Sequence, residues 1–340
     1  MISKQIPLEL RWYVIADDLT GALDAVAPFA QRGATCVVVT DIAHLTEDIF
    51  KRAQVVGLST NSREIAPKAA AQSVGRALKL APRGWRIVKK IDSRIKGNVA
   101  AELNAFGPSK FAMLPAIPEM DRNVIKGQVC GFGVNAPIDI RAAIQGVQGQ
   151  IAIPDILSQS DMMKAVQSFD TDCIMVGARG MMRAAAELQF GAKRPYLSLG
   201  GKIGAIIGSH DKITQNQIAA CVDQSLGLYV WPDETWIWPR NDHNIIQMIT
   251  DPPDLSRLPD FVQAAIELGQ GHETWIVSGG ATAQLVLDKM GIYVLDVLGE
   301  CDRGLPLSQV RQVHFVTKSG GFGGNQTLRT LMKKGLGANG

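Results

Sequence analysis

Short apolar runs alternate with amphipathic stretches along the whole chain of 340 residues. A polar or glycine turn follows each run, and the next stretch places its apolar residues on one helical face. Such alternation is typical of βαβ units, so the sequence predicts an α/β fold with mainly parallel sheets. The runs expected as strands are 11–16, 35–40, 54–60, 86–91, 111–116 and 173–178, then 204–209, 226–231, 274–280, 292–299 and 313–318. Helices are expected over 21–32 and 64–80 and near 214–221.

The runs fall into two series, which predicts two α/β domains. The glycine-rich segment 198–204 separates the series, so the expected domains are 1–200 and 201–340. A chain of this length is also longer than one ordinary domain. An active-site cleft is expected between the two domains.

The composition excludes several classes of protein. Hydrophobic residues make up 46% and charged residues 20%, which is typical of a globular chain. The net charge of +3 comes from scattered basic residues, so no nucleic-acid partner is expected. Neither a signal peptide nor a membrane span is expected, which favours the cytoplasm. The five cysteines are far apart and are expected to be structural, and self-association into a homo-oligomer is left open.

Candidate chemistry follows the expected strands, because ligands of parallel α/β sheets bind beyond the carboxyl ends of strands. The first strand is followed by Asp17 and Asp18, then by Thr20 and Gly21. A helix N-cap would explain one of these residues but not both aspartates. The pair of carboxylates therefore indicates a functional loop.

Two further loops of the first domain combine charged and hydroxyl groups. Arg63 follows the third strand, and the segment 92–98, Asp-Ser-Arg-Ile-Lys-Gly-Asn, follows the fourth. Arginine can bind a carboxylate through two hydrogen bonds, and aspartate accepts hydrogen bonds from hydroxyls. The loops favour a site for a hydroxylated acid, with surface charge pairing as the alternative. Glu119 and Arg122, after the fifth strand, would extend its rim.

The second domain carries glycine-rich turns between strands and helices. One is Ser-Gly-Gly-Ala-Thr at 278–282, and the other is Lys-Ser-Gly-Gly-Phe-Gly-Gly at 318–324. Glycines let backbone N–H groups approach phosphate oxygens, and a helix N-terminus adds positive potential. Neither turn matches GxxxxGK[ST] or GxGxxG, which argues against a P-loop enzyme and a Rossmann dehydrogenase. The five histidines are solitary, so no metal site built from them is expected.

Five motifs occur in an order that resembles the four-carbon acid sugar kinase family. They lie at 16–22, 89–98, 115–119, 278–283 and 318–323, and the resemblance runs from about residue 11 to residue 334. It implies an N-terminal domain that binds the acid sugar and a C-terminal domain that binds ATP with Mg²⁺. It also implies phosphorylation of the terminal hydroxyl of threonate, erythronate or a 3-oxo-tetronate.

The resemblance and the loops together assign roles to individual residues. The acid is expected to lie against Asp17, Arg63, Lys90, Arg94 and Lys96. The nucleotide is expected at Ser209, Gly279, Gly280, Ala281, Thr282, Lys318, Gly320 and Gly321. The acceptor of the hydroxyl proton is left undecided between Asp18 and Asp92, and no residue is assigned as a metal ligand.

Three features depart from the family pattern. Ala281 stands where the family usually has an acidic residue, and the family's DSTLRGN reads Asp-Ser-Arg-Ile-Lys-Gly-Asn at 92–98. The chain is also shorter than typical members, with the loss expected after 134–140. A non-catalytic ligand-binding paralogue is therefore one alternative. A haloacid-dehalogenase-like phosphatase is another, although its DxD spacing is absent.

Overall fold

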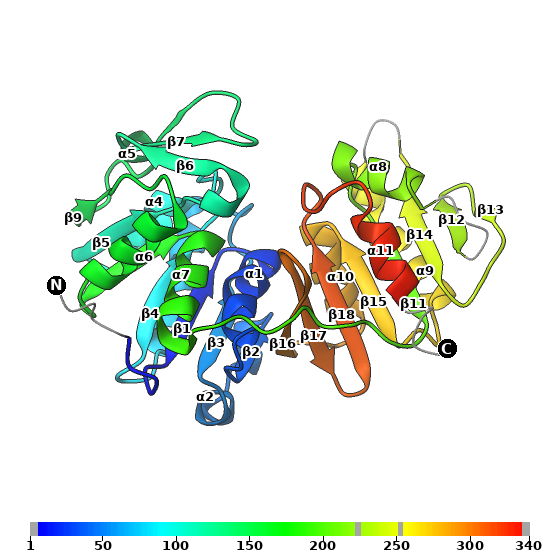
Figure 1. The fold of residues 1–340 in the computed structure, drawn as a ribbon, viewed down its shortest axis with the longest axis horizontal. Helices are drawn as coiled ribbons and strands as arrows, with labels where there is room; N and C mark the ends of the chain where they lie inside the picture. The colour runs from blue at the N-terminus through cyan, green and yellow to red at the C-terminus, as the bar shows by residue number, and fades with distance from the viewer. Residues whose placement is uncertain (1–5, 222–225, 251–253, 335–340) are drawn as a thin grey trace. The chain divides into compact units, whose positions relative to one another are not determined.

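The computed structural model describes residues 6–221, 226–250 and 254–334. The chain divides into two compact units between Arg194 and Pro195. This division lies in a segment without helix or strand, residues 191–202, which also contains the boundary expected at residue 200. Each unit is described below by itself (Figure 1).

The first unit contains a parallel sheet, its helices and a small second sheet. In chain order its elements are β1 (Trp12–Ala16), α1 (Leu19–Ala30), β2 (Cys36–Val39), η1 (Ile42–His44), α2 (Glu47–Arg52), β3 (Val55–Ser59), α3 (Pro67–Lys79), β4 (Arg86–Lys90), α4 (Val99–Asn104), β5 (Ser109–Leu114), η2 (Pro118–Met120), β6 (Arg122–Ile125), β7 (Gln128–Gly131), β8 (Ile138–Asp139), α5 (Ile140–Ala143), β9 (Gly149–Ala152), α6 (Gln159–Ser168), β10 (Cys173–Gly177) and α7 (Arg179–Phe190).

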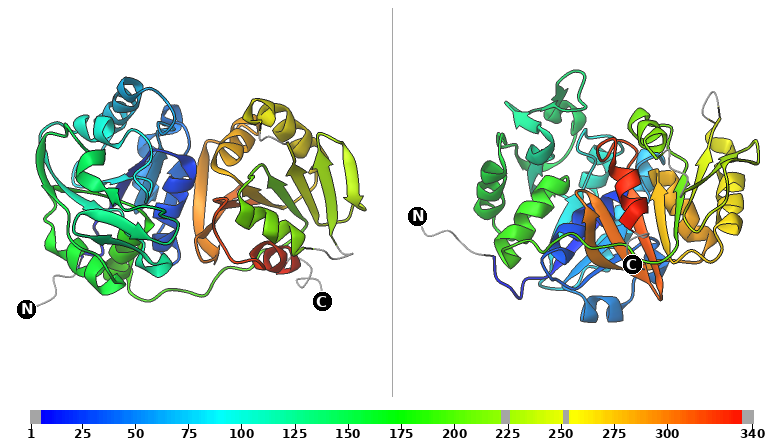
Figure 2. Two further views of the ribbon diagram at one scale, coloured as in Figure 1. Left: turned by 90° about the horizontal axis from the view of Figure 1, so that it is seen from above. Right: turned by 45° about the vertical axis from the view of Figure 1, so that its right-hand side comes forward.

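The main sheet of the first unit has the order β2-β3-β1-β4-β10-β5-β9, and all its pairings are parallel. Helix α1 joins β1 to β2, whereas α3 joins β3 to β4 in the opposite direction along the sheet. Right-handed crossovers therefore place the two helices on opposite faces, and Figure 2 shows helices on both faces. Because both faces are covered, strands such as β1 and β3 are buried at every residue and appear as continuous apolar runs.

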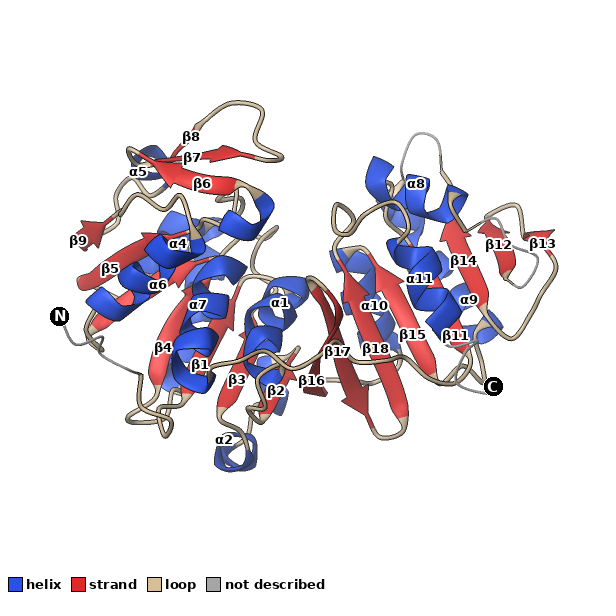
Figure 3. Cartoon of the chain, viewed as in Figure 1, coloured by secondary structure: helices blue, strands red, loops and turns tan. Residues whose placement is uncertain are grey.

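A small antiparallel sheet, β6-β7-β8, stands beside the main one (Figure 3). Its first two strands are joined by Lys126 and Gly127, both with positive φ (49° and 76°). A two-residue turn of this kind matches the twist of a hairpin. The pattern of apolar runs did not predict this sheet, because its strands are short and only partly buried.

The second unit has its own mainly parallel sheet. In chain order its elements are β11 (Ile203–Ile207), α8 (Lys212–Ala219), β12 (Gly227–Trp231), β13 (Thr235–Trp238), β14 (Asn244–Met248), η3 (Leu255–Arg257), α9 (Leu258–Leu268), β15 (Thr274–Ser278), α10 (Gly280–Lys289), β16 (Val294–Asp302), β17 (Leu305–Val310), β18 (Val313–Lys318) and α11 (Thr327–Lys334).

The strand order in this unit is β13-β12-β14-β11-β15-β18-β17-β16. The pairings from β12 to β18 are parallel, and the outer strands β13, β17 and β16 are added antiparallel. Helix α8 packs with α11, and α9 packs with α10. The mainly parallel α/β fold predicted from the alternation of runs is thus confirmed in both units. In the described part of the chain, no helix is long and apolar enough to cross a bilayer.

Candidate functional site

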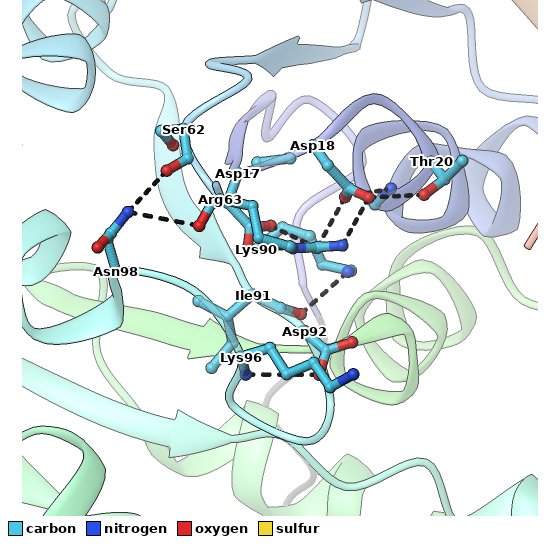
Figure 4. Close-up of polar contacts among 12 residues, drawn as sticks. Asp17, Asp18, Thr20, Ser62, Arg63, Lys90, Ile91, Asp92, Lys96 and Asn98 are labelled. Carbon is cyan, nitrogen blue, oxygen red and sulfur yellow. Dashed lines mark hydrogen bonds and ion pairs between the residues drawn. The ribbon is translucent and has the colours of Figure 1, made fainter. Parts of the chain in front are cut away.

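The charged loops predicted in the first unit meet at one edge of its sheet. Asp17 and Asp18 follow β1, Arg63 lies beyond β3, and Asp92 lies beyond β4. These strands are neighbours in the order β3-β1-β4, so their carboxyl ends lie side by side. Figure 4 shows the side chains converging from three segments that are far apart in the sequence.

The guanidinium of Arg63 binds both aspartates. Its Nε and Nη2 donate to the two oxygens of Asp17, each at 2.9 Å. Its Nη1 and Nη2 donate to the two oxygens of Asp18, at 2.7 and 2.8 Å. Charge-assisted bidentate pairs of this kind are strong and fix orientation. The two aspartates and Arg63 therefore form one rigid cluster. Arg63 was expected to contact the acid, but in the fold its guanidinium binds these two carboxylates of the protein.

Asp18 is also the N-cap of α1. Besides Arg63, its carboxylate accepts hydrogen bonds from the backbone N–H of Gly21 (2.8 Å) and from Thr20 Oγ1 (2.7 Å). A Cβ at Gly21 would lie 2.4 Å from Asp18 Oδ1, so a side chain there would displace the cap. Four accepted hydrogen bonds fill the capacity of a carboxylate.

The loop after β4 leaves its charged side chains more open. Asp92 is half-buried, and its Oδ2 accepts from the backbone N–H of Arg94 at 2.8 Å. The side chains of Arg94 and Lys96 are exposed. Lys90 is buried, and its Nζ donates to Ile91 O at 3.0 Å. A Cβ at Gly21 would lie 3.0 Å from the same Nζ, so Lys90 points toward the start of α1.

Behind these loops lies a buried ion pair that the sequence did not predict. Lys89 and Glu102 are both 0% exposed, and Lys89 Nζ lies 3.0 Å from Glu102 Oε2. The two groups attract each other as opposite charges. Their contact lacks the alignment of a hydrogen bond, and among the described residues Glu102 Oε2 accepts none. The other oxygen, Oε1, accepts from the hydroxyl of Ser62. Lys89 also donates to Lys90 O at 3.0 Å.

Asp17 stays charged despite its burial. Burial raises the pKa of Asp17, but the charge of Lys89, the hydrogen bonds and charge of Arg63 and the charge of Lys90 together hold it below its ordinary value. The side chain is only 1% exposed. Desolvation and opposite charges compete at such a site, and here the opposite charges prevail. Asp17 is therefore a carboxylate at neutral pH.

Two more arginines belong to the same edge. Arg122 donates to Ser93 Oγ at 2.6 Å and twice to Phe132 O, which ties the small sheet to the loop after β4. Arg179, at the start of α7, binds Asp24 Oδ1 at 2.8 Å and Glu119 Oε1 at 3.0 Å. The rim positions Glu119 and Arg122 are thus held in structural pairs. Arg179 was missed, although it follows β10 as the other loops follow their strands.

The glycine turns of the second unit also meet at one edge. Ser209 follows β11, Gly279 follows β15 and Gly320 follows β18, and these strands are neighbours. A Cβ at Gly320 would lie 2.3 Å from Ser209 Oγ. Gly279 has φ of +110°, and a Cβ there would lie 2.9 Å from Thr282 Oγ1. Glycine at 320 therefore lets the turns after β11 and β18 approach each other, and glycine at 279 allows the positive φ of its turn.

Lys318 holds its turn together from below. The residue is 1% exposed, and its ammonium donates to Thr214 Oγ1 (2.8 Å), Gly320 O (3.0 Å) and Ser319 O (3.2 Å). Three hydrogen bonds use all the donors of an ammonium group. Burial lowers the pKa of Lys318 to about 8, against a weaker opposing effect of Asp211. Its role here is to shape the turn.

The remaining nucleotide candidates lie at the start of α10 and beside α8. Gly280 is the first residue of α10, Ala281 is exposed on its first turn, and Thr282 is buried. A Cβ at Gly321 would lie 3.5 Å from Asp211 Oδ2, an ordinary contact. Among the residues that the structure describes, no cluster of three or more His, Cys, Asp or Glu could hold a metal by itself.

Comparisons with known proteins fit this division of chemistry. A model described as a sugar-binding N-terminal domain matches residues 12–138, and a model described as a nucleotide-binding C-terminal domain matches residues 256–328. The chain is 27% identical to a D-threonate kinase of Cupriavidus necator, over 94% of this chain and 96% of the relative. It is 24% identical to a 3-oxo-tetronate kinase of Burkholderia multivorans, over 93% and 96%.

A solved structure supports the fold. A Salmonella typhimurium protein superposes with a TM-score of 0.75 at 19% identity, over 95% of this chain and 98% of that one. The alignment with the Cupriavidus necator relative extends over 405 positions, so that relative has segments that these 340 residues lack. Two domain models in the expected order, together with kinases matched over nearly their full length, show that the chain belongs to the four-carbon acid sugar kinase family.

Proposed function

We propose that this chain is an ATP-dependent kinase that phosphorylates the terminal hydroxyl of a four-carbon sugar acid of the threonate, erythronate or 3-oxo-tetronate type. The observation that carries the proposal is the contrast between two strand edges. The edge in the first unit gathers carboxylates and cations, whereas the edge in the second gathers glycine turns and a helix N-terminus. The names of the relatives support the class of acid.

The acid would bind where cations remain open to a ligand. The Arg63 guanidinium already makes four hydrogen bonds to Asp17 and Asp18, so it serves as a wall of the site. Within the described residues Lys90 donates one hydrogen bond, so its ammonium has donors left for a carboxylate or hydroxyl of the substrate. Arg94 and Lys96, both exposed, would add positive charge toward the acid group.

Asp92 is the better candidate for the acceptor of the hydroxyl proton. The four lone-pair positions of Asp18 are filled by Arg63, Gly21 and Thr20. Asp92 is half-buried, and among the described residues its Oδ2 accepts hydrogen bonds from the backbone N–H groups of its own loop, whereas its Oδ1 accepts none. A general base needs a free oxygen near the proton that it takes, and Asp92 Oδ1 meets that need.

ATP would lie on the second edge. Backbone N–H groups of the turns after β15 and β18, with the hydroxyls of Ser209 and Thr282, would bind the phosphates. Mg²⁺ commonly takes one or two protein carboxylates and completes its shell with phosphates and water, so the exposed Asp211 beside Gly321 fits as its ligand. The ion would neutralise phosphate charge, which with positioning is the main source of catalysis in phosphoryl transfer.

A turnover assay tests the proposal. The purified chain is incubated with γ-labelled ATP, Mg²⁺ and a panel of four-carbon sugar acids in both stereochemical series. Label is expected in at least one acid, and Asp92→Asn is expected to lower turnover by at least about a hundredfold while the acid still binds. Phosphate release from the phosphorylated acids, measured in parallel, would instead support the phosphatase alternative.

A second candidate function is ligand binding without catalysis. It is favoured by Ala281, because the first turn of α10 carries no acidic residue. Under this alternative the folded wild-type chain binds an acid in calorimetry and transfers no label from ATP to any member of the panel. That pair of results would replace the kinase proposal.

A further inference from the structure

The buried pair Lys89–Glu102 has no contact with solvent, yet it lies directly behind the cluster of Asp17, Asp18 and Arg63. Both side chains are 0% exposed. Removing two charges from water is costly, and well-packed apolar residues often replace such a pair without loss of stability. A role in the neighbouring site would give a reason for a charged pair at this position.

Contacts lead from Glu102 to the cluster in two steps. Glu102 accepts from Ser62 Oγ, which also lies 2.6 Å from Thr60 Oγ1. The backbone N–H groups of Ser62 and Arg63 both donate to Asp17 O, at 2.9 and 3.2 Å. Glu102 on α4 thus holds the start of the segment whose next residue, Arg63, binds both aspartates.

Lys89 reaches the same cluster through its charge. Successive side chains of a strand point to opposite faces, so Lys89 faces Glu102 while Lys90 faces the start of α1. The charged groups around Asp17 are Lys89 and Lys90 from β4, Arg63 beyond β3, Asp18 beside it, and Glu102 behind Lys89. The charge of Lys89 is the largest single cause that lowers the Asp17 pKa, and Arg63 lowers it through both its hydrogen bonds and its charge.

We propose that Lys89 and Glu102 are positioning residues of the acid site, which fix the Ser62–Arg63 segment and supply a buried positive charge behind Asp17. The inference rests on the proposed function for its kinetic readout. Neither residue would touch the substrate. Their effect would pass through Arg63 and Asp17.

Three variants separate positioning from a purely structural role. Lys89→Met and Glu102→Gln each leave one buried charge unpaired and are expected to lower stability. The double variant removes both charges, and its glutamine can still accept from Ser62. It is expected to be more stable than either single variant in urea denaturation. Lys89→Arg keeps the charge and serves as the conservative rescue.

The kinetic result expected for the double variant is selective. KM for the acid rises at least about tenfold, because contacts of charged groups contribute a factor of that order, while KM for ATP is unchanged. The acid limb of the pH–rate profile moves to higher pH. Lys89→Arg stays near the wild type in both measures. Recovery of the acid KM together with stability in the double variant would show a purely structural pair.

A measurement without substrate tells failure of this inference from failure of the proposed function. The Asp17 carboxyl carbon is followed by NMR in aspartate-labelled protein and assigned with Asp17→Asn. In the double variant it is expected to titrate at higher pH than in the wild type, even if the wild type transfers no phosphate. Identical titration in the two proteins would overturn the inference.

Discussion

The carboxyl edges of the two sheets occupy the same place in their folds but are built from different chemistry. In the first unit the edge is held by ion pairs, with Arg63 between Asp17 and Asp18 and with Lys89 on Glu102. In the second unit the corresponding turns are held by glycine packing, hydroxyls and the ammonium of Lys318 on neutral oxygens. Topology therefore fixes where each site lies, and the side chains decide which ligand it suits.

The difference has a physical meaning for the ligands. Charged groups that neutralise one another can present oriented donors and acceptors to a small hydroxylated acid. Glycine turns expose backbone N–H groups without side chains, which suits phosphate oxygens. Variants that damage one edge should therefore leave the ligand of the other edge unaffected.

The largest effect is expected at the ion-paired edge. Asp17→Asn removes the charge of a carboxylate that is 1% exposed. Arg63 and Lys89 then lose the negative charge that they face at this position. Breaking a buried pair in this way is expected to lower the free energy of unfolding by about 3–5 kcal/mol in urea denaturation. Asp92→Asn, at a half-buried position, is the control and should lose less than about 1 kcal/mol. Equal losses of unfolding free energy in the two variants would contradict the stabilising role of the Asp17 charge.

The second prediction concerns the glycine edge. In Gly320→Val a Cβ that would lie 2.3 Å from Ser209 Oγ must push the turns apart. ATP affinity measured by calorimetry is expected to fall by at least about a hundredfold, since loss of several phosphate contacts exceeds 2.7 kcal/mol. Acid affinity should not change. Gly324→Ala, where a Cβ meets nothing within 4 Å, is the matched control and should bind ATP normally.

The third prediction tests the open cations of the first unit. Arg94 is exposed, and its hydrogen bond to Asp92 comes from its backbone N–H, so removal of its side chain spares the fold. Arg94→Ala is expected to weaken acid binding by about 1.5–3 kcal/mol and to leave ATP binding unchanged. Equal weakening of both ligands would assign Arg94 to the fold instead.

The fold could be predicted wherever burial is continuous. Strands such as β1 and β15 are buried at every position and have apolar centres, because helices cover both sheet faces. β14 was missed because Asn244 and Gln247 interrupt its apolar run. β17 was missed because it contains Pro306 and Ser308, and a proline argues against a strand inside a sheet.

The site could be predicted only as far as chain order shows it. Loops after strands identified Asp17, Asp18, Arg63 and Asp92, which the fold does bring to one edge. The partners of these groups could not be read from the sequence. Glu102 lies on a short helix 40 residues after Ser62, and only tertiary packing joins the two. For the same reason, the sequence could not show that the guanidinium of Arg63 binds two aspartates of the protein.

The fourth prediction concerns the pH dependence of stability that the buried Lys318 gives to the glycine-turn edge. Lys318 has a pKa of about 8 in the fold and an ordinary value of 10.5. Between these values the unfolded chain binds more protons, so stability rises with pH by at most about 1.4 kcal/mol per pH unit. Lys318→Met should lack this contribution. Urea denaturation of both proteins at pH 7.5 and pH 10 measures the difference, and parallel pH curves would show that Lys318 does not titrate there.

The smallest effect is expected at Ala281. Ala281→Asp adds an exposed carboxylate to the first turn of α10, where the helix dipole favours negative charge by about 0.3–1 kcal/mol. The family usually has an acidic residue here, so turnover with Mg²⁺ and ATP is also expected to rise. Ala281→Asn is the control, because it adds a polar group of the same shape without the charge. Greater stability without higher turnover in the aspartate variant would mean that the turn around Ala281 has lost the partner of that carboxylate. A rise in turnover shared by both variants would mean that hydrogen bonding, and not charge, is what the alanine lacks.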